Sequence, residues 1–173
     1  MDPQILIGLL GPFVIIGVLM AIILPIKHRR RNPPGTSETR EAIRLDAAGQ
    51  LAEAAALFTT AIAKVERRKG RRSKEVADLL VRLGSSHSRH GDPDAAEAAY
   101  GEALEIYRAL PKATPADRAE AQYGLFFVRT AQKRDREALQ LLEEATLGFD
   151  ATYGLNHPRT EDTHHYLVRH YIA

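Results

Sequence analysis

Apolar residues recur at intervals of three and four along most of the chain, from about residue 38 onward. This is the helical period, and no stretch alternates apolar and polar residues as a strand would. The pattern also returns at a larger interval of 42 residues. Small residues share one register and bulkier ones another, one turn later: Ala54, Ala96 and Ala138, then Phe58, Tyr100 and Leu142. A fixed period of this length predicts stacked helical hairpins, because a single hairpin buries too little apolar surface to be stable alone.

Turn residues divide this pattern into three hairpins and one further helix. We expect the hairpins to turn at Gly49–Gln50, at Gly91–Pro93 and near Lys133–Arg134. The second helix of the third hairpin is expected to run from 135 to about 149. The final helix, from residue 157 or 158 to 171, is expected to cover the last apolar face of the stack.

The N-terminal region differs, because residues 5–26 form a run of 22 residues without a charge. As a helix this run would be about 33 Å long, enough to cross a hydrocarbon core of about 30 Å. A cleaved signal peptide is the rival interpretation, but it would have a basic start and a shorter apolar region. Here the basic residues follow the run: Lys27, Arg29, Arg30 and Arg31. The positive-inside rule therefore predicts a single-pass membrane protein with its N-terminus outside and its C-terminal domain in the cytoplasm.

These patterns predict three parts of the chain. Residues 1–31 hold the transmembrane helix and its basic juxtamembrane flank, residues 32–37 (NPPGTS) form a linker, and residues 38–173 form the helical domain. Gly17 and Ala21 stand four residues apart, a spacing that lets two spans pack closely. A homo-oligomer and a lipid-facing span without a partner both stay open.

The second hairpin carries a family resemblance. Its ordered residues are similar to the tetratricopeptide repeat consensus: Leu83, Gly84, Gly91, Ala96, Tyr100, Ala103 and Leu104. That repeat has 34 residues, whereas the 42-residue period resembles the longer repeats of arrays similar to kinesin light chain. The segment from Tyr153 to Thr160 resembles the inter-repeat loop of the same subclass. The third hairpin departs from the consensus, because Phe126 stands where Gly84 stands in the second.

The resemblance covers roughly residues 36–173 and implies an all-α fold. The expected architecture is a right-handed α-solenoid of helix–turn–helix (TPR-like) repeats, preceded by the single transmembrane helix. In this family the first helix of each hairpin lines a concave face that binds other proteins. The corresponding candidate partner-binding residues are Asp78, Arg82, Ser85, Arg89, Tyr123, Phe127 and Thr130. The asparagines that hold a chaperone tail in some relatives are missing, so the mixed aromatic and basic face favours a peptide or short helix.

A basic loop between the first and second hairpins offers an alternative. It contains Arg67, Arg68, Lys69, Arg71, Arg72 and Lys74, whereas the rest of the array has more acidic than basic residues. Such a loop, with the juxtamembrane cluster, would bind phosphates of a membrane surface or of nucleic acid. The absence of interleaved aromatic residues disfavours nucleic acid. A solvated loop with no binding role is the simpler reading.

The sequence predicts neither an enzyme nor a metal or cofactor site. The chain has no cysteine, which excludes disulfides and thiolate chemistry. It has no nucleophile elbow, no phosphate-binding glycine loop and no zinc-protease motif. Several histidines gather near the C-terminus, but no pair has the i, i+4 spacing of a helical metal site. We therefore expect an adaptor or assembly scaffold whose partner is an unidentified protein or peptide.

Overall fold

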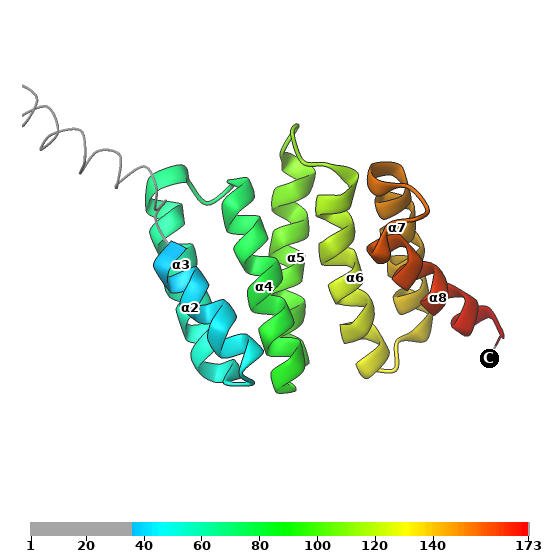
Figure 1. Cartoon of the computed structure of the whole chain (residues 1–173), viewed down its shortest axis with the longest axis horizontal. Coiled ribbons are helices and arrows are strands. Elements are labelled where there is room, and N and C mark those ends of the chain that lie inside the picture. The colour runs from blue at the N-terminus through cyan, green and yellow to red at the C-terminus, as the bar shows by residue number, and fades with distance from the viewer. Residues whose placement is uncertain (1–35, 173) are drawn as a thin grey trace, which may run out of the picture.

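The computed structural model describes residues 36–172, which form seven α-helices in a row (Figure 1). They are α2 (Thr36–Ala47), α3 (Leu51–Lys69), α4 (Lys74–His90), α5 (Pro93–Ala109), α6 (Pro115–Ala131), α7 (Asp135–Tyr153) and α8 (Pro158–Ile172). None of these helices is long and apolar enough to cross a membrane. The predicted transmembrane helix 5–26, the basic flank 27–31 and the linker residues 32–35 lie outside the described residues. Residues 36 and 37, the last two of the predicted linker, belong to α2, which begins at Thr36.

The three predicted hairpins are confirmed as α2–α3, α4–α5 and α6–α7. Each turns at a residue with a left-handed backbone: Gly49 (φ 78°), Gly91 (φ 86°) and Lys133 (φ 58°). Successive positions are 42 residues apart, so the left-handed backbone conformation recurs with the same period as the sequence pattern. Glycine adopts this region freely, whereas lysine has a Cβ that crowds the following carbonyl. Lys133 is therefore a strained position in the third turn.

Two helix starts use a capping side chain followed by proline. The Asp92 carboxylate accepts a hydrogen bond from the backbone N–H of Ala95 (3.1 Å) at the start of α5. At the start of α6, the Thr114 hydroxyl accepts from the N–H of Asp117 (3.2 Å), and the Asp117 carboxylate accepts from the N–H of Thr114 (2.8 Å). This reciprocal capping box satisfies two backbone donors that the helix itself leaves without partners.

Helix α7 is one turn longer than expected. It ends at Tyr153 instead of near Phe149, because no glycine or proline lies between Phe149 and Gly154. The N–H of Gly154 donates to the carbonyl of Asp150 (3.0 Å), and its φ of 78° then ends the helix. Helix α3 has the same length, 19 residues, and ends in the same way at Gly70.

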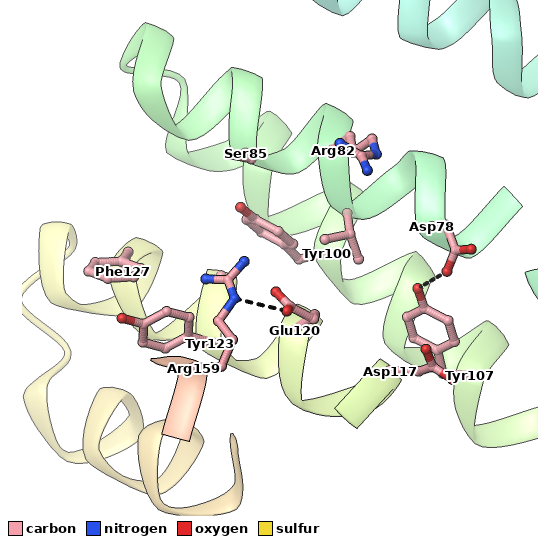
Figure 2. Close-up of a pocket in the computed structure, with 12 residues that line it drawn as sticks. Asp78, Arg82, Ser85, Tyr100, Tyr107, Asp117, Glu120, Tyr123, Phe127 and Arg159 are labelled. Atoms are coloured by element: carbon pink, nitrogen blue, oxygen red, sulfur yellow. Dashed lines mark hydrogen bonds and ion pairs between the residues drawn. The ribbon is translucent and has the colours of Figure 1, made fainter. Parts of the chain in front are cut away.

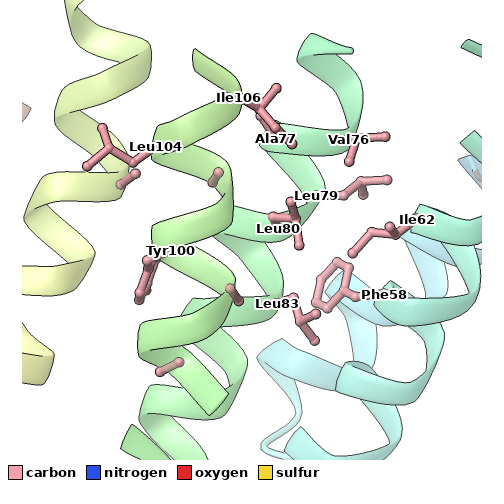
Figure 3. Packing of buried hydrophobic residues seen from close by; sticks show 14 of the residues in the cluster. Phe58, Ile62, Val76, Ala77, Leu79, Leu80, Leu83, Tyr100, Leu104 and Ile106 are labelled. Carbon is pink, nitrogen blue, oxygen red and sulfur yellow. The ribbon is translucent and has the colours of Figure 1, made fainter. Parts of the chain in front are cut away.

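The hydrophobic core follows the predicted registers. The small residues at the helix crossings are fully buried: Ala54, Ala61, Ala96, Ala103, Ala138 and Ala145. Phe58, Tyr100 and Leu142 are at most 5% exposed. Figure 3 shows Phe58 and Ile62 of α3 packed toward Leu80 and Leu83 of α4. Each side chain of this size contributes roughly 1.5–3 kcal/mol by leaving water. A second cluster joins α6, α7 and α8, so α6 belongs to both parts of the core.

Tyr100 occupies the space between hairpins, and two glycines make that possible. A Cβ added at Gly84 of α4 would lie 3.0 Å from the Tyr100 ring, and one added at Gly124 of α6 would lie 2.3 Å from it. Sequence comparison of the hairpins pointed to Phe126 as the residue replacing the glycine in α6. That register holds, and Phe126 packs into the second cluster at 3% exposure, whereas the room for Tyr100 on α6 comes from a different residue, Gly124.

Candidate partner-binding groove

A groove of about 480 Å³ lies between α4 and α6 (Figure 2). Helix α5 contributes to its floor, and the first turn of α8 closes one side. We call it the α4–α6 groove. Its lining residues are Asp78, Val81, Arg82, Ser85, Tyr100, Tyr107, Asp117, Glu120, Tyr123, Gly124, Phe127 and Arg159. The first helices of the second and third hairpins therefore supply most of the groove.

Five of the seven residues predicted for the concave face line this groove: Asp78, Arg82, Ser85, Tyr123 and Phe127. The other two do not. Arg89 forms an ion pair with Asp46 of α2, and Thr130 donates to the carbonyl of Phe126 (2.9 Å) within its own helix. The side chains of Arg89 and Thr130 thus both bind groups within the array. The partner-binding role of all seven stays a prediction.

One end of the groove is acidic and hydrogen-bonded. The Tyr107 hydroxyl donates to Asp78 (2.7 Å), and the Lys74 ammonium bonds to Asp78 (3.0 Å) and to Asp117. Burial, together with the bond to Asp78, raises the pKa of Tyr107 well above its usual value. Burial acts to raise the pKa of Asp117, but the bonds from Lys74 and Thr114 outweigh it and lower that pKa. This end is a satisfied network that holds α4, α5 and α6 together.

The middle of the groove holds a carboxylate–guanidinium pair. Figure 2 shows Arg159, from the start of α8, reaching Glu120 of α6. Their Nε to Oε1 distance is 3.1 Å, and the guanidinium also lies 6.0 Å from the centre of the Tyr123 ring. Burial raises the pKa of Glu120, against the attraction of Arg159 and Arg82. Burial likewise raises the pKa of Tyr100 and of Tyr123 to about 12, so both phenols stay neutral hydrogen-bonding groups.

The other end of the groove offers an aromatic surface, and an exposed cation lies on α4 nearer the middle (Figure 2). Phe127 is 38% exposed, although its ring lies 4.9 Å from that of Tyr123 and 5.5 Å from that of Tyr166. Arg82 is exposed on α4 and makes no ion pair or hydrogen bond with any residue from 36 to 172. An apolar ring and an unpaired guanidinium are groups that a ligand can bind without displacing an existing contact.

Tyr123 is less exposed than a residue of the predicted contact surface is expected to be. It is only 8% exposed, because Phe126, Phe127, Phe149 and Tyr166 surround its ring. Its edge reaches the groove, but most of the side chain belongs to the core. Phe127 is therefore the more exposed of the two aromatic residues predicted for this face.

The list of candidate residues omitted seven lining residues, of which Val81 lies on α4 beside Arg82. Tyr100 and Tyr107 were assigned to the core because they lie on the second helix of their hairpin, and they are indeed buried at 5% and 2%. Arg159 was missed because it comes from α8, whose docking over α6 no periodicity reveals. Asp117, Glu120 and Gly124 lie on α6 in the same stripe as Tyr123 and Phe127, so helical spacing from those two residues was the signal available.

The basic loop is partly used by the fold. Lys69 pairs with Glu75, Arg71 pairs with Glu102 (2.8 Å), and Lys74 belongs to the acidic end of the groove. The other three basic residues of the loop make no ion pair or hydrogen bond within the described part of the chain: Arg67, Arg68 and Arg72. The loop therefore presents a smaller free positive surface than its sequence suggests.

The C-terminal histidines serve the start and docking of α8. His157 Nδ1 accepts a hydrogen bond from the backbone N–H of Arg159 (3.2 Å), and its ring stacks on Tyr153 (4.2 Å), so His157 orders the turn before α8. His164 Nε2 lies 3.2 Å from both carboxylate oxygens of Asp150 on α7. Among residues 36–172, no group of three or more histidine or acidic side chains is arranged to hold a metal ion.

Comparison with known proteins identifies the architecture. Residues 45–109 match the family model of the tetratricopeptide repeat, and this match covers the end of α2 and all of α3, α4 and α5. The fold is that of a tetratricopeptide repeat array. Among solved structures, the chain is similar to a Podosopora anserina protein assigned as a kinesin light chain with nearly identical TPR-like repeats. The TM-score is 0.69 at 22% identity, over 81% of this chain and 67% of that one.

A single-substitution variant of that protein gives the same TM-score of 0.69 and the same identity of 22%, over 80% of this chain and 66% of that chain. No curated protein matches the sequence. The likeness to the solved structure covers a larger share of the chain than the family match over residues 45–109 does. The resemblance to long-period tetratricopeptide arrays is thus confirmed for the fold.

Proposed function

We propose that the chain is a membrane-anchored adaptor whose tetratricopeptide array binds a peptide or short helix of a partner protein in the α4–α6 groove. The observation that carries the proposal is the combination of Phe127 and Arg82 in that groove. Phe127 is an exposed aromatic residue beside buried ones, and Arg82 is a cation with no ion pair to any residue from 36 to 172. Tetratricopeptide arrays generally mediate contacts between proteins, which supports the same conclusion.

The groove suits a polypeptide better than a reacting small molecule. It is open along α4 and α6, and its polar groups are spread along it instead of converging on one point. An apolar side chain of the ligand would cover Phe127, and a backbone or side-chain acceptor would meet Arg82. This is the arrangement by which a groove binds an extended peptide or one face of a helix.

The membrane anchor of the proposal rests on the sequence of residues 5–26. A run of this length without a charge, followed by a basic flank, supports a single span with the array in the cytoplasm. In this arrangement the groove would recruit a partner to the membrane surface. A reporter enzyme fused after Ala173 tests the orientation: activity in the cytoplasm supports it, and activity only on the opposite side of the membrane contradicts it.

Two groove variants with matched controls test the binding role. The full chain is extracted in mild detergent, and captured proteins are identified by mass spectrometry. Arg82→Glu and Phe127→Ala should each lose the captured partner. Arg136→Glu reverses an exposed charge outside the groove, and Leu147→Ala truncates an apolar side chain that is 69% exposed on α7, so both should retain it. Retention of the same partner by both groove variants contradicts the proposal.

Salt dependence separates this function from binding through the basic loop. A ligand held by Phe127 and one cation should stay bound when salt rises, because little of its affinity comes from released counterions. A ligand held by phosphate contacts would lose most of its affinity over the same range. Three of the six loop residues are already paired within the array, and this favours the groove.

A further inference from the structure

The tetratricopeptide array has two ends that differ in charge. The connections α3–α4, α5–α6 and α7–α8 lie at one end, and α2–α3, α4–α5 and α6–α7 lie at the other (Figure 1). We call the first the tether end and define it as residues 67–73, 110–114 and 154–157. It contains basic residues and no acidic residue: Arg67, Arg68, Lys69, Arg71, Arg72 and Lys112. The opposite connections, residues 48–50, 91–92 and 132–134, mix Asp92 with Lys133 and Arg134.

Most of the basic residues at the tether end have no partner side chain in the described part of the chain. Arg67, Arg68, Arg72 and Lys112 make no ion pair or hydrogen bond with residues 36–172. Arg67 and Arg68 lie on the last turn of α3, where their positive charges stabilise the helix because its C-terminus carries a partial negative charge. Arg72 is not explained in this way, since it precedes the start of α4, where the helix dipole is positive. Its position points to an anionic partner outside the chain.

An exposed leucine lies in the third connection of the same end. Leu155 is 68% exposed, and the loop that carries it is held in place by its neighbours. Tyr153 stacks on Phe149 (6.1 Å between ring centres) and on His157 (4.2 Å), so Leu155 is presented on an ordered turn. Tyr153 is itself 47% exposed. Leu155 thus lies beside a tyrosine at an end of the array that carries several cations. Surfaces that bind at the membrane–water interface combine these three kinds of residue.

The N-terminus of the array lies toward the same end. Helix α2 begins beside the C-terminal half of α3, where Glu38 pairs with Lys64. Residues 27–35 separate the predicted span from α2, and nine residues reach at most about 30 Å. This tether brings the array within reach of the bilayer but does not choose its orientation, because α3 with its 19 residues is itself about 28 Å long. The basic residues and Leu155 therefore indicate which end of the array faces the bilayer.

We propose that the tether end docks on the anionic phospholipid surface next to the membrane anchor. Arg67, Arg68, Arg72 and Lys112 contact lipid phosphates, and Leu155 enters the headgroup region. The α4–α6 groove runs along the sides of its helices, between the two ends, and stays open to the cytoplasm. The proposal rests on the anchor of the proposed function and is independent of what the groove binds.

The absence of cysteine allows a clean test by single-site labelling. The full chain is placed in lipid nanodiscs, either neutral or containing phosphatidylserine, with a polarity-sensitive fluorophore on one introduced cysteine. Leu155→Cys reports the tether end. Leu147→Cys is the matched control. Leu147 is equally exposed (69%), but it lies on α7 about 9 Å before the end of that helix at Tyr153. Gln50→Cys reports the opposite end.

The proposal predicts an apolar environment for the label at 155 in anionic discs and an aqueous one at 147 and 50. The label at 155 should return to water in neutral discs. The triple variant Arg68→Gln, Arg72→Gln, Lys112→Gln should weaken the contact on the order of a hundredfold, at about fivefold for each cation. Lys133→Gln with Arg136→Gln, at the other end, should leave it unchanged.

Three results overturn the proposal: an aqueous label at 155 in anionic discs, an apolar label at 50, or a response of 155 to RNA that equals its response to anionic lipid. The membrane anchor is tested separately, by asking whether alkaline carbonate extracts the unlabelled chain from membranes. If the chain is extracted, the anchor has failed, and the label at 155 is then read on addition of anionic vesicles. An apolar shift supports the docking surface, and its absence overturns it.

Discussion

Tyr100 packs against two glycines on neighbouring hairpins, and this contact gives a stability prediction of definite sign. In the variant Gly124→Ala the new Cβ would lie 2.3 Å from Cε1 and Cζ of the Tyr100 ring. Carbon atoms attract at about 3.5–4.0 Å, so the overlap exceeds 1 Å. The ring also meets the Gly84 position, where a Cβ would have 3.0 Å, so it has little room to retreat.

Two opposing terms set the size of the effect. Overpacking a buried site costs about 1–3 kcal/mol, and a rigid ring held on both helices favours the upper value. Replacing glycine by alanine within a helix returns about 1 kcal/mol. We therefore expect a net loss of about 2 kcal/mol in the free energy of unfolding. Equilibrium urea unfolding of the full chain in mild detergent, followed by circular dichroism, measures it.

Gly101 is the matched control. It lies inside α5, next to Tyr100 in sequence, and a Cβ there would meet nothing within 4 Å. Gly101→Ala should therefore stabilise the array by about 1 kcal/mol, the helix-propensity gain alone. In a Tyr100→Leu background, which removes the overlapped ring atoms, most of the cost of Gly124→Ala should disappear. A Gly124→Ala variant as stable as the unmodified chain would refute the packing argument.

Two further predictions concern the third turn and the pH profile. Lys133→Gly should stabilise the array by about 1 kcal/mol by removing left-handed strain, and Gly91→Ala should destabilise it by a similar amount; equal unfolding midpoints for both variants would contradict this. Arg129, bonded to Glu97, lowers the pKa of Glu97 to about 2. Ionised Glu97 therefore adds stability above its unfolded pKa near 4.3, and this is lost as the pH falls through about 2. Thermal midpoints of Glu97→Gln should fall less between pH 5 and pH 2 than those of the unmodified chain, and parallel profiles would exclude the ion pair as a cause.

The fold was predictable from the sequence because its period is visible at three levels. Small residues, bulky residues and turn residues all return after 42 positions. The end of α7 was wrong by one turn, because residues 150–153 carry no period of their own and only Gly154 ends the helix. The contact of Gly124 with Tyr100 was not predicted, since Gly124 lies outside the consensus register that Phe126 occupies.

The candidate groove was predictable where it lies on a first helix and not elsewhere. Arg82 and Phe127 follow from helical spacing along α4 and α6. Arg159 enters from α8, and its approach to Glu120 depends on how that helix docks, which is a tertiary effect. The same docking buries Tyr123, so its loss of exposure could not be read from the pattern of α6.

The central claim is that a protein partner occupies the α4–α6 groove, and photo-crosslinking from Phe127 tests it most directly. A benzophenone amino acid replaces Phe127, which is 38% exposed in the groove, or Leu147, which is 69% exposed outside it. Irradiation of cells producing the full chain should give a discrete protein adduct from position 127, lost with Arg82→Glu, and none from position 147. An adduct from position 147 alone, or equal adducts from both positions, would contradict the account.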